Sequence, residues 1–173
     1  VSFPRSTGNT PCFYNHFVTD REEPFDQPGT PEEPKGHYIF DKPEPLWNFG
    51  HGKSYTTFDY VDCALSDTLL VASDTLKVSV TIKNTGRCDG KEVVQLYVRD
   101  KVSTVATPIQ QLKAFQKVLI KPGESQCVEL SLPIAELALY NAKMEEVVEP
   151  GDFEIQIGAA SDDIRFKKTI TIN

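Results

Sequence analysis

The chain has 173 residues, which is enough for one domain with a sizeable hydrophobic core. Its 25 acidic and 18 basic residues give a formal net charge of −7, and the basic residues are interspersed along the sequence. A nucleic-acid-binding surface needs clustered Lys and Arg, and a membrane span needs about 20 consecutive apolar residues. The sequence has neither feature, so it predicts neither nucleic acid nor a membrane as a partner.

The first part of the chain, residues 1–53, shows no sustained period of two or 3.6 residues. It holds eight of the twelve prolines and the acidic pairs Glu22-Glu23 and Glu32-Glu33. Because proline fixes φ and removes a backbone donor, this segment can be neither a central strand nor a helix. We expect an irregular Pro-rich arm, whose middle part near residues 20–35 is disordered when the chain is isolated.

From Tyr55 onward, apolar and polar residues alternate, as expected for strands with one buried and one solvent-facing side. The clearest example is residues 76–83, where Leu, Val and Ile alternate with Lys, Ser and Thr. One helical turn is expected at residues 133–137, and no segment predicts a helix of ordinary length. The alternating runs predict strands near residues 55–65, 76–84, 92–100, 112–120, 126–132, 136–140, 144–148, 152–159 and 164–172.

Turn-forming sequences separate these runs. Asn84-Thr85-Gly86, Lys121-Pro122-Gly123-Glu124 and Glu149-Pro150-Gly151-Asp152 combine residues that favour tight turns. Short strands at this spacing predict an all-β, antiparallel β-sandwich. We expect one core within residues 54–173, attached to the arm of residues 1–53.

The junction between the arm and the first strand is rich in aromatic residues and glycine. It reads Pro45-Leu46-Trp47-Asn48-Phe49-Gly50-His51-Gly52-Lys53-Ser54-Tyr55-Thr56-Thr57-Phe58. So much aromatic surface is disfavoured in water, so we expect the junction to pack on a protein surface. We expect Trp47 to pack on the chain's own sandwich, and any leftover apolar surface to drive weak association into a homodimer.

This junction resembles the one that leads into the fibronectin type III-like domain of family 3 glycoside hydrolases, near their C-terminus. Val1–Ser6 and Cys12–His16 resemble the end of the α/β sandwich domain that precedes it in that family. Later motifs agree in order and spacing: Val78–Gly86, Gly90–Asp100, Leu112–Val118, Lys121–Glu124 and Val148–Ile155. The chain thus resembles the C-terminal part of a β-glucosidase or β-xylosidase, with an immunoglobulin/fibronectin type III-like fold.

The resemblance implies a parent enzyme that hydrolyses terminal β-linked glucose or xylose from oligosaccharides. Its Asp nucleophile, on a barrel domain, and its Glu acid/base, on an α/β sandwich domain, would both lie upstream of Val1. The chain would then be a noncatalytic module, inactive alone, that braces these two domains in a periplasmic or extracellular enzyme without a cofactor. The alternative is a stand-alone carbohydrate-binding or adhesive β-sandwich.

The residues themselves supply no catalytic pair. Glycoside hydrolysis generally needs two carboxylates about 5–5.5 Å or about 6.5–9.5 Å apart. Glu145 and Glu146 are adjacent on an expected strand, so their side chains point to opposite faces. The glutamate pairs of the arm, at residues 22–23 and 32–33, have no strand to position them. We interpret all of these residues as solvated acids and predict no catalytic residue in this chain.

Two residues of the junction are candidates for contact with a sugar. Trp47 offers a ring on which a pyranose could stack, and His51 lies between two glycines. A turn histidine held by the backbone is the simpler interpretation of His51, and the same holds for His37 beside Tyr38. Tyr97 lies on the strand face opposite to its apolar neighbours, so we expect it to be a further surface aromatic.

Four cysteines, Cys12, Cys63, Cys88 and Cys127, allow three disulfide pairings. Their density is far below that of a disulfide-rich scaffold, and we favour free thiols. Cys12 and His16 have a spacing compatible with two metal ligands. Structural zinc requires four ligands and no second pair follows, so no metal site is predicted.

Overall fold

The computed structural model describes residues 1–10, 12–17, 31 and 44–173. The disorder expected near residues 20–35 lies outside the described residues, except at residue 31. Among the described residues, no helix has the length and apolar composition needed to cross a membrane. The elements are η1 (Thr7–Asn9), β1 (Phe58–Leu65), β2 (Leu69–Leu70), β3 (Thr75–Asn84), β4 (Gly90–Asp100), β5 (Gln111–Ile120), β6 (Ser125–Pro133), η2 (Ile134–Leu137), β7 (Leu139–Tyr140), β8 (Glu146–Val147), β9 (Gly151–Gly158) and β10 (Ile164–Ile172).

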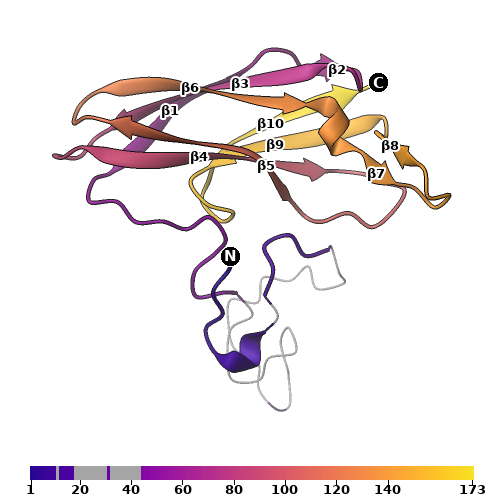
Figure 1. Cartoon of the computed structure of the whole chain (residues 1–173), viewed down its shortest axis with the longest axis horizontal. Coiled ribbons are helices and arrows are strands. Elements are labelled where there is room, and N and C mark those ends of the chain that lie inside the picture. The colour runs from indigo at the N-terminus through magenta and orange to yellow at the C-terminus, as the bar shows by residue number, and fades with distance from the viewer. Residues whose placement is uncertain (11, 18–30, 32–43) are drawn as a thin grey trace.

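Two sheets pack face to face and form a sandwich (Figure 1). One has the order β1-β3-β6 and the other the order β2-β10-β9-β4-β5, while β7 and β8 form a separate ladder. The predicted all-β antiparallel sandwich is confirmed, and η2 is the expected helical turn. The parallel pairing of β2 with β10 was not predicted, because two residues are too few to show a period. The first strand begins at Phe58, three residues later than predicted, because Tyr55 is fully exposed.

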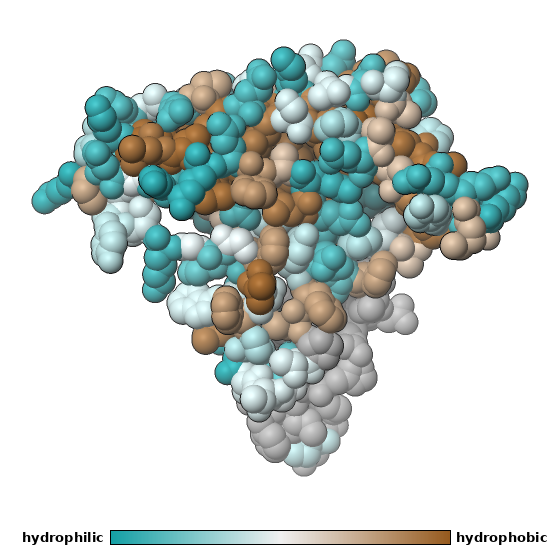
Figure 2. Space-filling model, viewed as in Figure 1, coloured by the Kyte–Doolittle hydropathy of each residue, from teal (hydrophilic) through white to brown (hydrophobic). Residues whose placement is uncertain are grey.

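The core lies between the sheets. Leu76, Val78, Val80 and Ile82 of β3 are fully buried, as their alternation predicts. They belong to one cluster with the inward side chains of β4, β6, β9 and β10. Figure 2 shows apolar side chains along the flank between the two sheets, with mostly hydrophilic residues around them. Burying each large aliphatic side chain contributes about 1.5–3 kcal/mol, so this cluster is the main source of stability.

The central strands of the larger sheet are buried on both faces. Alternation places Gln95, Tyr97 and Gln156 on the side of this sheet that points away from the core, which we call the outer face. Tyr97 is nevertheless 0% exposed, and Gln95 and Gln156 are 3% and 4% exposed. The prediction that Tyr97 is a surface aromatic is therefore wrong, because the arm lies against the outer face (Figure 1).

A hydrogen-bonded pair of side chains connects the two sheets near the edge of the core. The Tyr60 hydroxyl of β1 donates to Glu92 Oε1 of β4 at 3.3 Å. Arg165 of β10 lies over the Tyr60 ring, 5.6 Å from its centroid, and forms its ion pair with Asp163. Burial raises the pKa of Tyr60 and also that of Glu92. The tyrosine therefore stays protonated and acts as the donor.

We expect Glu92→Gln to raise the free energy of unfolding at neutral pH and to change it little below about pH 4. The folded-state pKa of Glu92 lies above its unfolded value, so the folded state binds the proton more tightly. The stability that this proton contributes is present at low pH and is lost as the pH rises through the folded pKa. Urea unfolding of both proteins across this range measures the effect. If the free energies of unfolding of the two proteins run parallel across this pH range, Glu92 is not the group that causes the pH dependence.

Candidate functional site

Two segments of the arm that are far apart in sequence meet on the outer face. Tyr14 stacks on Phe49 with ring centroids 4.0 Å apart, and it contacts the Tyr97 ring in a T-shaped arrangement at 6.0 Å. The backbone N–H of Leu112 in β5 donates to the Tyr14 hydroxyl at 3.2 Å, and that of Ser161 donates to the Phe49 carbonyl at 2.9 Å. Aromatic pairs contribute about 0.5–1.5 kcal/mol beyond the area they bury. The arm is therefore docked on the sandwich through specific contacts.

The buried amide of Gln95 completes this docking site. Its Nε2 donates to the Gly50 carbonyl at 3.2 Å and to the Ala159 carbonyl, and its Oε1 accepts the Tyr97 hydroxyl at 2.6 Å. Gly50 has φ +82°, a conformation that favours glycine. A Cβ at this position would also overlap the Gln95 amide. Glycine is thus favoured at this position both by the positive φ angle and by the lack of space for a Cβ beside Gln95.

We expect Gly50→Ala to loosen the arm and to lower the free energy of unfolding by about 1–3 kcal/mol, through left-handed strain and overpacking. Gly52→Ala is the matched control, because Gly52 has open space around its Cβ position. The control should change stability by less than about 0.5 kcal/mol. Urea unfolding followed by the fluorescence of Trp47 measures both variants. Equal effects of the two substitutions would show that the junction is not docked as described.

The contacts of Trp47 lie within the arm, whereas packing on the sandwich was predicted. Its ring stacks on His51 at a centroid distance of 4.6 Å, and Lys53 Nζ lies 4.9 Å from its centroid. Its backbone pairs with Phe3, whose N–H donates to the Trp47 carbonyl at 2.8 Å. Trp47 remains 39% exposed, and Phe49 rather than Trp47 is the junction aromatic that joins the stack on the sandwich. A role of Trp47 and His51 in sugar binding stays a prediction.

The other side chains considered from the sequence lie apart from this docking site. Glu145 is exposed in a turn, where its carboxylate accepts the Asn141 amide at 3.0 Å, and Glu146 is exposed on β8. His16 is exposed, with its Nδ1 3.1 Å from the Phe17 carbonyl. Within the described ranges, no three His, Cys, Asp or Glu side chains are grouped as metal ligands would be. The arm glutamates at residues 22–23 and 32–33, and the pair at residues 37–38, lie outside the described residues.

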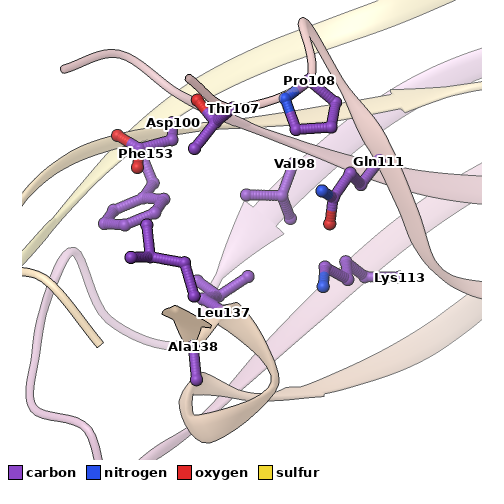
Figure 3. Close-up of a pocket in the computed structure, with 10 residues that line it drawn as sticks. Val98, Asp100, Thr107, Pro108, Gln111, Lys113, Leu137, Ala138 and Phe153 are labelled. Atoms are coloured by element: carbon purple, nitrogen blue, oxygen red, sulfur yellow. The ribbon is translucent and has the colours of Figure 1, made fainter. Parts of the chain in front are cut away.

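A pocket opens beside the loop that connects β4 to β5 (Figure 3). Asp100 and Lys113 stand on opposite sides of it, with Val98 between them. Burial raises the pKa of Asp100 and lowers that of Lys113, whose Nζ donates to the Glu136 carbonyl at 2.7 Å. Asp100 is the one carboxylate among the described residues that line this pocket. A second carboxylate, Glu149, also raises the pKa of Asp100 from outside this lining, where it accepts hydrogen bonds from Ser103 and Thr104.

The cysteines are free thiols in very different surroundings. Cys63 is buried in the core, Cys12 is half-buried, and Cys88 and Cys127 are exposed. Burial raises the pKa of the Cys63 thiol, so it stays protonated and acts as a small apolar side chain.

Sequence reasoning missed Tyr14 and Gln95 as members of the docking site, and it missed the burial of Gln156 beside Tyr97. The residue types at the outward strand positions could have indicated that this face is covered. An outward strand position next to solvent usually carries Lys, Glu or Thr, whereas β4 and β9 place uncharged amides and a tyrosine there. Such residues suit a face that another segment covers.

Comparison with known proteins agrees with this architecture. Residues 92–161 match the family model of the fibronectin type III-like domain. The chain is 40% identical over 167 residues to a β-xylosidase of Formosa agariphila, and 37% identical over 164 residues to a periplasmic β-glucosidase of Salmonella typhimurium. These matches cover 95% and 93% of the chain but only 22% and 21% of the two relatives. The chain thus spans about a fifth of their length.

Solved structures give the same result. The crystal structure of a β-glucosidase from Listeria innocua in complex with glucose matches 99% of this chain and 23% of its own length, with a TM-score of 0.82 and 35% identity. The sequence match and the structural match therefore cover nearly the whole of this chain, the arm included. The chain corresponds to the C-terminal, fibronectin type III-like part of the β-glucosidases and β-xylosidases of glycoside hydrolase family 3.

Proposed function

We propose that the chain is a noncatalytic module of a longer β-glycosidase and that it braces the catalytic domains of that enzyme. The observation that supports this most strongly is the docking of the arm, through Tyr14, Phe49 and Gly50, on the outer face. A flexible tether would let the sandwich rotate freely, whereas stacked rings and buried hydrogen bonds fix it against the arm. A boundary between arm and sandwich at residues 53–54 belongs to this proposal.

The reaction proposed for the whole enzyme is hydrolysis of terminal β-linked glucose or xylose, as the names of the relatives suggest. This chain would contribute no proton transfer and no nucleophile. Asp100 stands without a second carboxylate in its pocket, and Glu145 and Glu146 are exposed at the β7–β8 ladder. The Asp nucleophile and the Glu acid/base would lie on the barrel and α/β domains, and the chemistry needs no cofactor.

We place the enzyme in the periplasm or outside the cell, because one relative is a periplasmic β-glucosidase. The partners of this chain would be the catalytic domains of the same polypeptide. A weak homodimer remains a proposal that follows from the exposed apolar residues of the arm, such as Phe3, Phe13 and Phe17.

A stand-alone carbohydrate-binding module has less support. Flat sugar faces stack on open aromatic rings. Here Tyr97 is buried, and the Trp47 ring is already in contact with His51 and Lys53.

The purified chain, assayed with nitrophenyl β-glucoside and β-xyloside and titrated with glucose, xylose and cellobiose, tests both functions. We expect no turnover above the buffer rate and no shift of the amide resonances. Turnover that co-elutes with the protein through repeated chromatography would contradict the noncatalytic role. Saturable shifts around Trp47 and His51 would instead favour the carbohydrate-binding module.

A further inference from the structure

The outer face carries an apolar area beside the docked arm. Phe115 and Leu119, on the edge strand β5, are 67% and 53% exposed. Phe115 pairs across the strands with Gln95, so both side chains lie on the outer face, and every second residue along each strand shares that face. We call this area the β5 patch. It consists of three apolar residues and two flanking lysines: Val93, Phe115, Leu119, Lys91 and Lys117.

The other half of the outer face is polar, and most of its side chains named here pair with one another, although the buried Gln156 Oε1 has no hydrogen-bond partner among the described residues. Glu154 of β9 pairs with Lys167 of β10 at 3.5 Å and accepts the Gln156 amide at 2.6 Å. The Thr171 hydroxyl donates to Asp152 at 2.7 Å. In the β5 patch, by contrast, neither lysine forms an ion pair with a carboxylate of the described residues.

We propose that the β5 patch is a second contact surface for the catalytic part of the same polypeptide, which would present an apolar centre with acidic residues around it. The inference rests on the proposed function. The patch is continuous with the arm-docking site through the Phe115–Gln95 pair, which favours a partner that adjoins the arm. The N-terminus also lies on this side of the sheet (Figure 1), so preceding domains would face the patch. Two unpaired lysines on a protein of net charge −7 fit an acidic partner.

A second copy of the chain fits the patch less well. Edge strands attract each other through their free backbone groups, and lysine on an edge opposes this pairing. The antiparallel register that sets Phe115 opposite Leu119 of a second copy would also set the two Lys117 side chains opposite each other. Like charges directly opposite are destabilising. Self-association through β5 is therefore an outcome that the test below must distinguish.

The test compares the isolated chain with the full-length enzyme. The variant is the double substitution Phe115→Ser and Leu119→Ser, and the control is Tyr140→Ser, because Tyr140 is 60% exposed on β7, outside the five-stranded sheet. In the isolated chain, neither variant should shift the melting temperature by more than about 2 °C. In the full-length enzyme, the patch variant should lower the temperature of thermal inactivation by about 4 °C or more, and the control should not. Lys117→Glu, which leaves the apolar residues intact, should act in the same direction and more strongly at low salt.

Two results would overturn the inference. One is that the patch variant and the control behave alike in the full-length enzyme. The other is that the isolated chain is a dimer by light scattering and the patch variant is a monomer, which would assign the patch to a second copy. The Gly50→Ala variant distinguishes a wrong assignment of the β5 patch from a wrong assignment of the bracing role. If Gly50→Ala lowers the inactivation temperature of the full-length enzyme and the patch variant does not, the module braces the enzyme through the arm alone. If neither does, the bracing role itself is wrong.

Discussion

Replacing Leu96 with Ala is expected to lower the free energy of unfolding of the isolated chain by about 2–5 kcal/mol. Leu96 is fully buried in β4, between Ala114 of β5 and Ile157 of β9. The close-packed core can collapse only in part around the missing carbons, so the substitution loses transfer free energy and also leaves a cavity. Urea unfolding followed by circular dichroism gives the value.

Thr81→Ala is the control for this experiment. Thr81 lies on β3 between the buried Val80 and Ile82, and its side chain points away from the core. Its replacement should change the free energy of unfolding by less than about 0.5 kcal/mol. A loss at Thr81 as large as the loss at Leu96 would mean that the two faces of the smaller sheet have been assigned wrongly.

The second large effect is expected at Asn84, the last residue of β3, which is fully buried. Its Nδ2 donates to the carbonyls of Cys88 and Ile120 at 2.9 and 2.8 Å. Its Oδ1 accepts from the Thr56 hydroxyl at 2.6 Å and from the Gly86 N–H at 3.0 Å. Asn84→Ala removes all four bonds and leaves buried partners unsatisfied, so we expect a loss of about 2–4 kcal/mol in urea unfolding.

Asn84→Asp distinguishes hydrogen bonding from packing at this site. The carboxylate keeps the volume of the amide and can still accept from Thr56 and Gly86, but it turns an oxygen toward two carbonyl oxygens. We expect a loss at least as large as for Asn84→Ala, and less than about 0.5 kcal/mol for the exposed neighbour in Lys83→Ala. A stable Asn84→Asp protein would show that the amide donors are unimportant.

Local pattern was enough to predict the sandwich. The alternation of β3 reports which of its sides faces the core, because a strand has a period of two residues and one face of each sheet is buried. Turn residues such as Gly123, with φ +77°, mark the ends of strands for the same local reason. These signals need no knowledge of distant segments.

The docking of the arm was not predictable in this way. Tyr14 contacts Tyr97, and Gly50 contacts Gln95, across more than forty residues of intervening sequence. Nothing local indicates which outward face of a strand a distant segment will cover. The aromatic richness of the junction predicted packing on protein, which holds for Phe49 but not for the fully exposed Tyr55. It did not reveal that Phe49 contacts the sandwich while Trp47 stacks on His51. The Gln95 amide, which holds the carbonyl of Gly50 next to Phe49, is also distant in sequence from the junction.

Thermal inactivation of the full-length enzyme carrying Leu96→Ala tests the bracing role most directly. Leu96 lies in the core of this module, so the substitution weakens the module without touching a catalytic group. We predict that the enzyme keeps its wild-type turnover number at 25 °C and loses activity faster on heating, at the temperature where calorimetry shows the module to unfold. The contradicting result is an enzyme that keeps its wild-type half-life of activity at a temperature where the module has already unfolded.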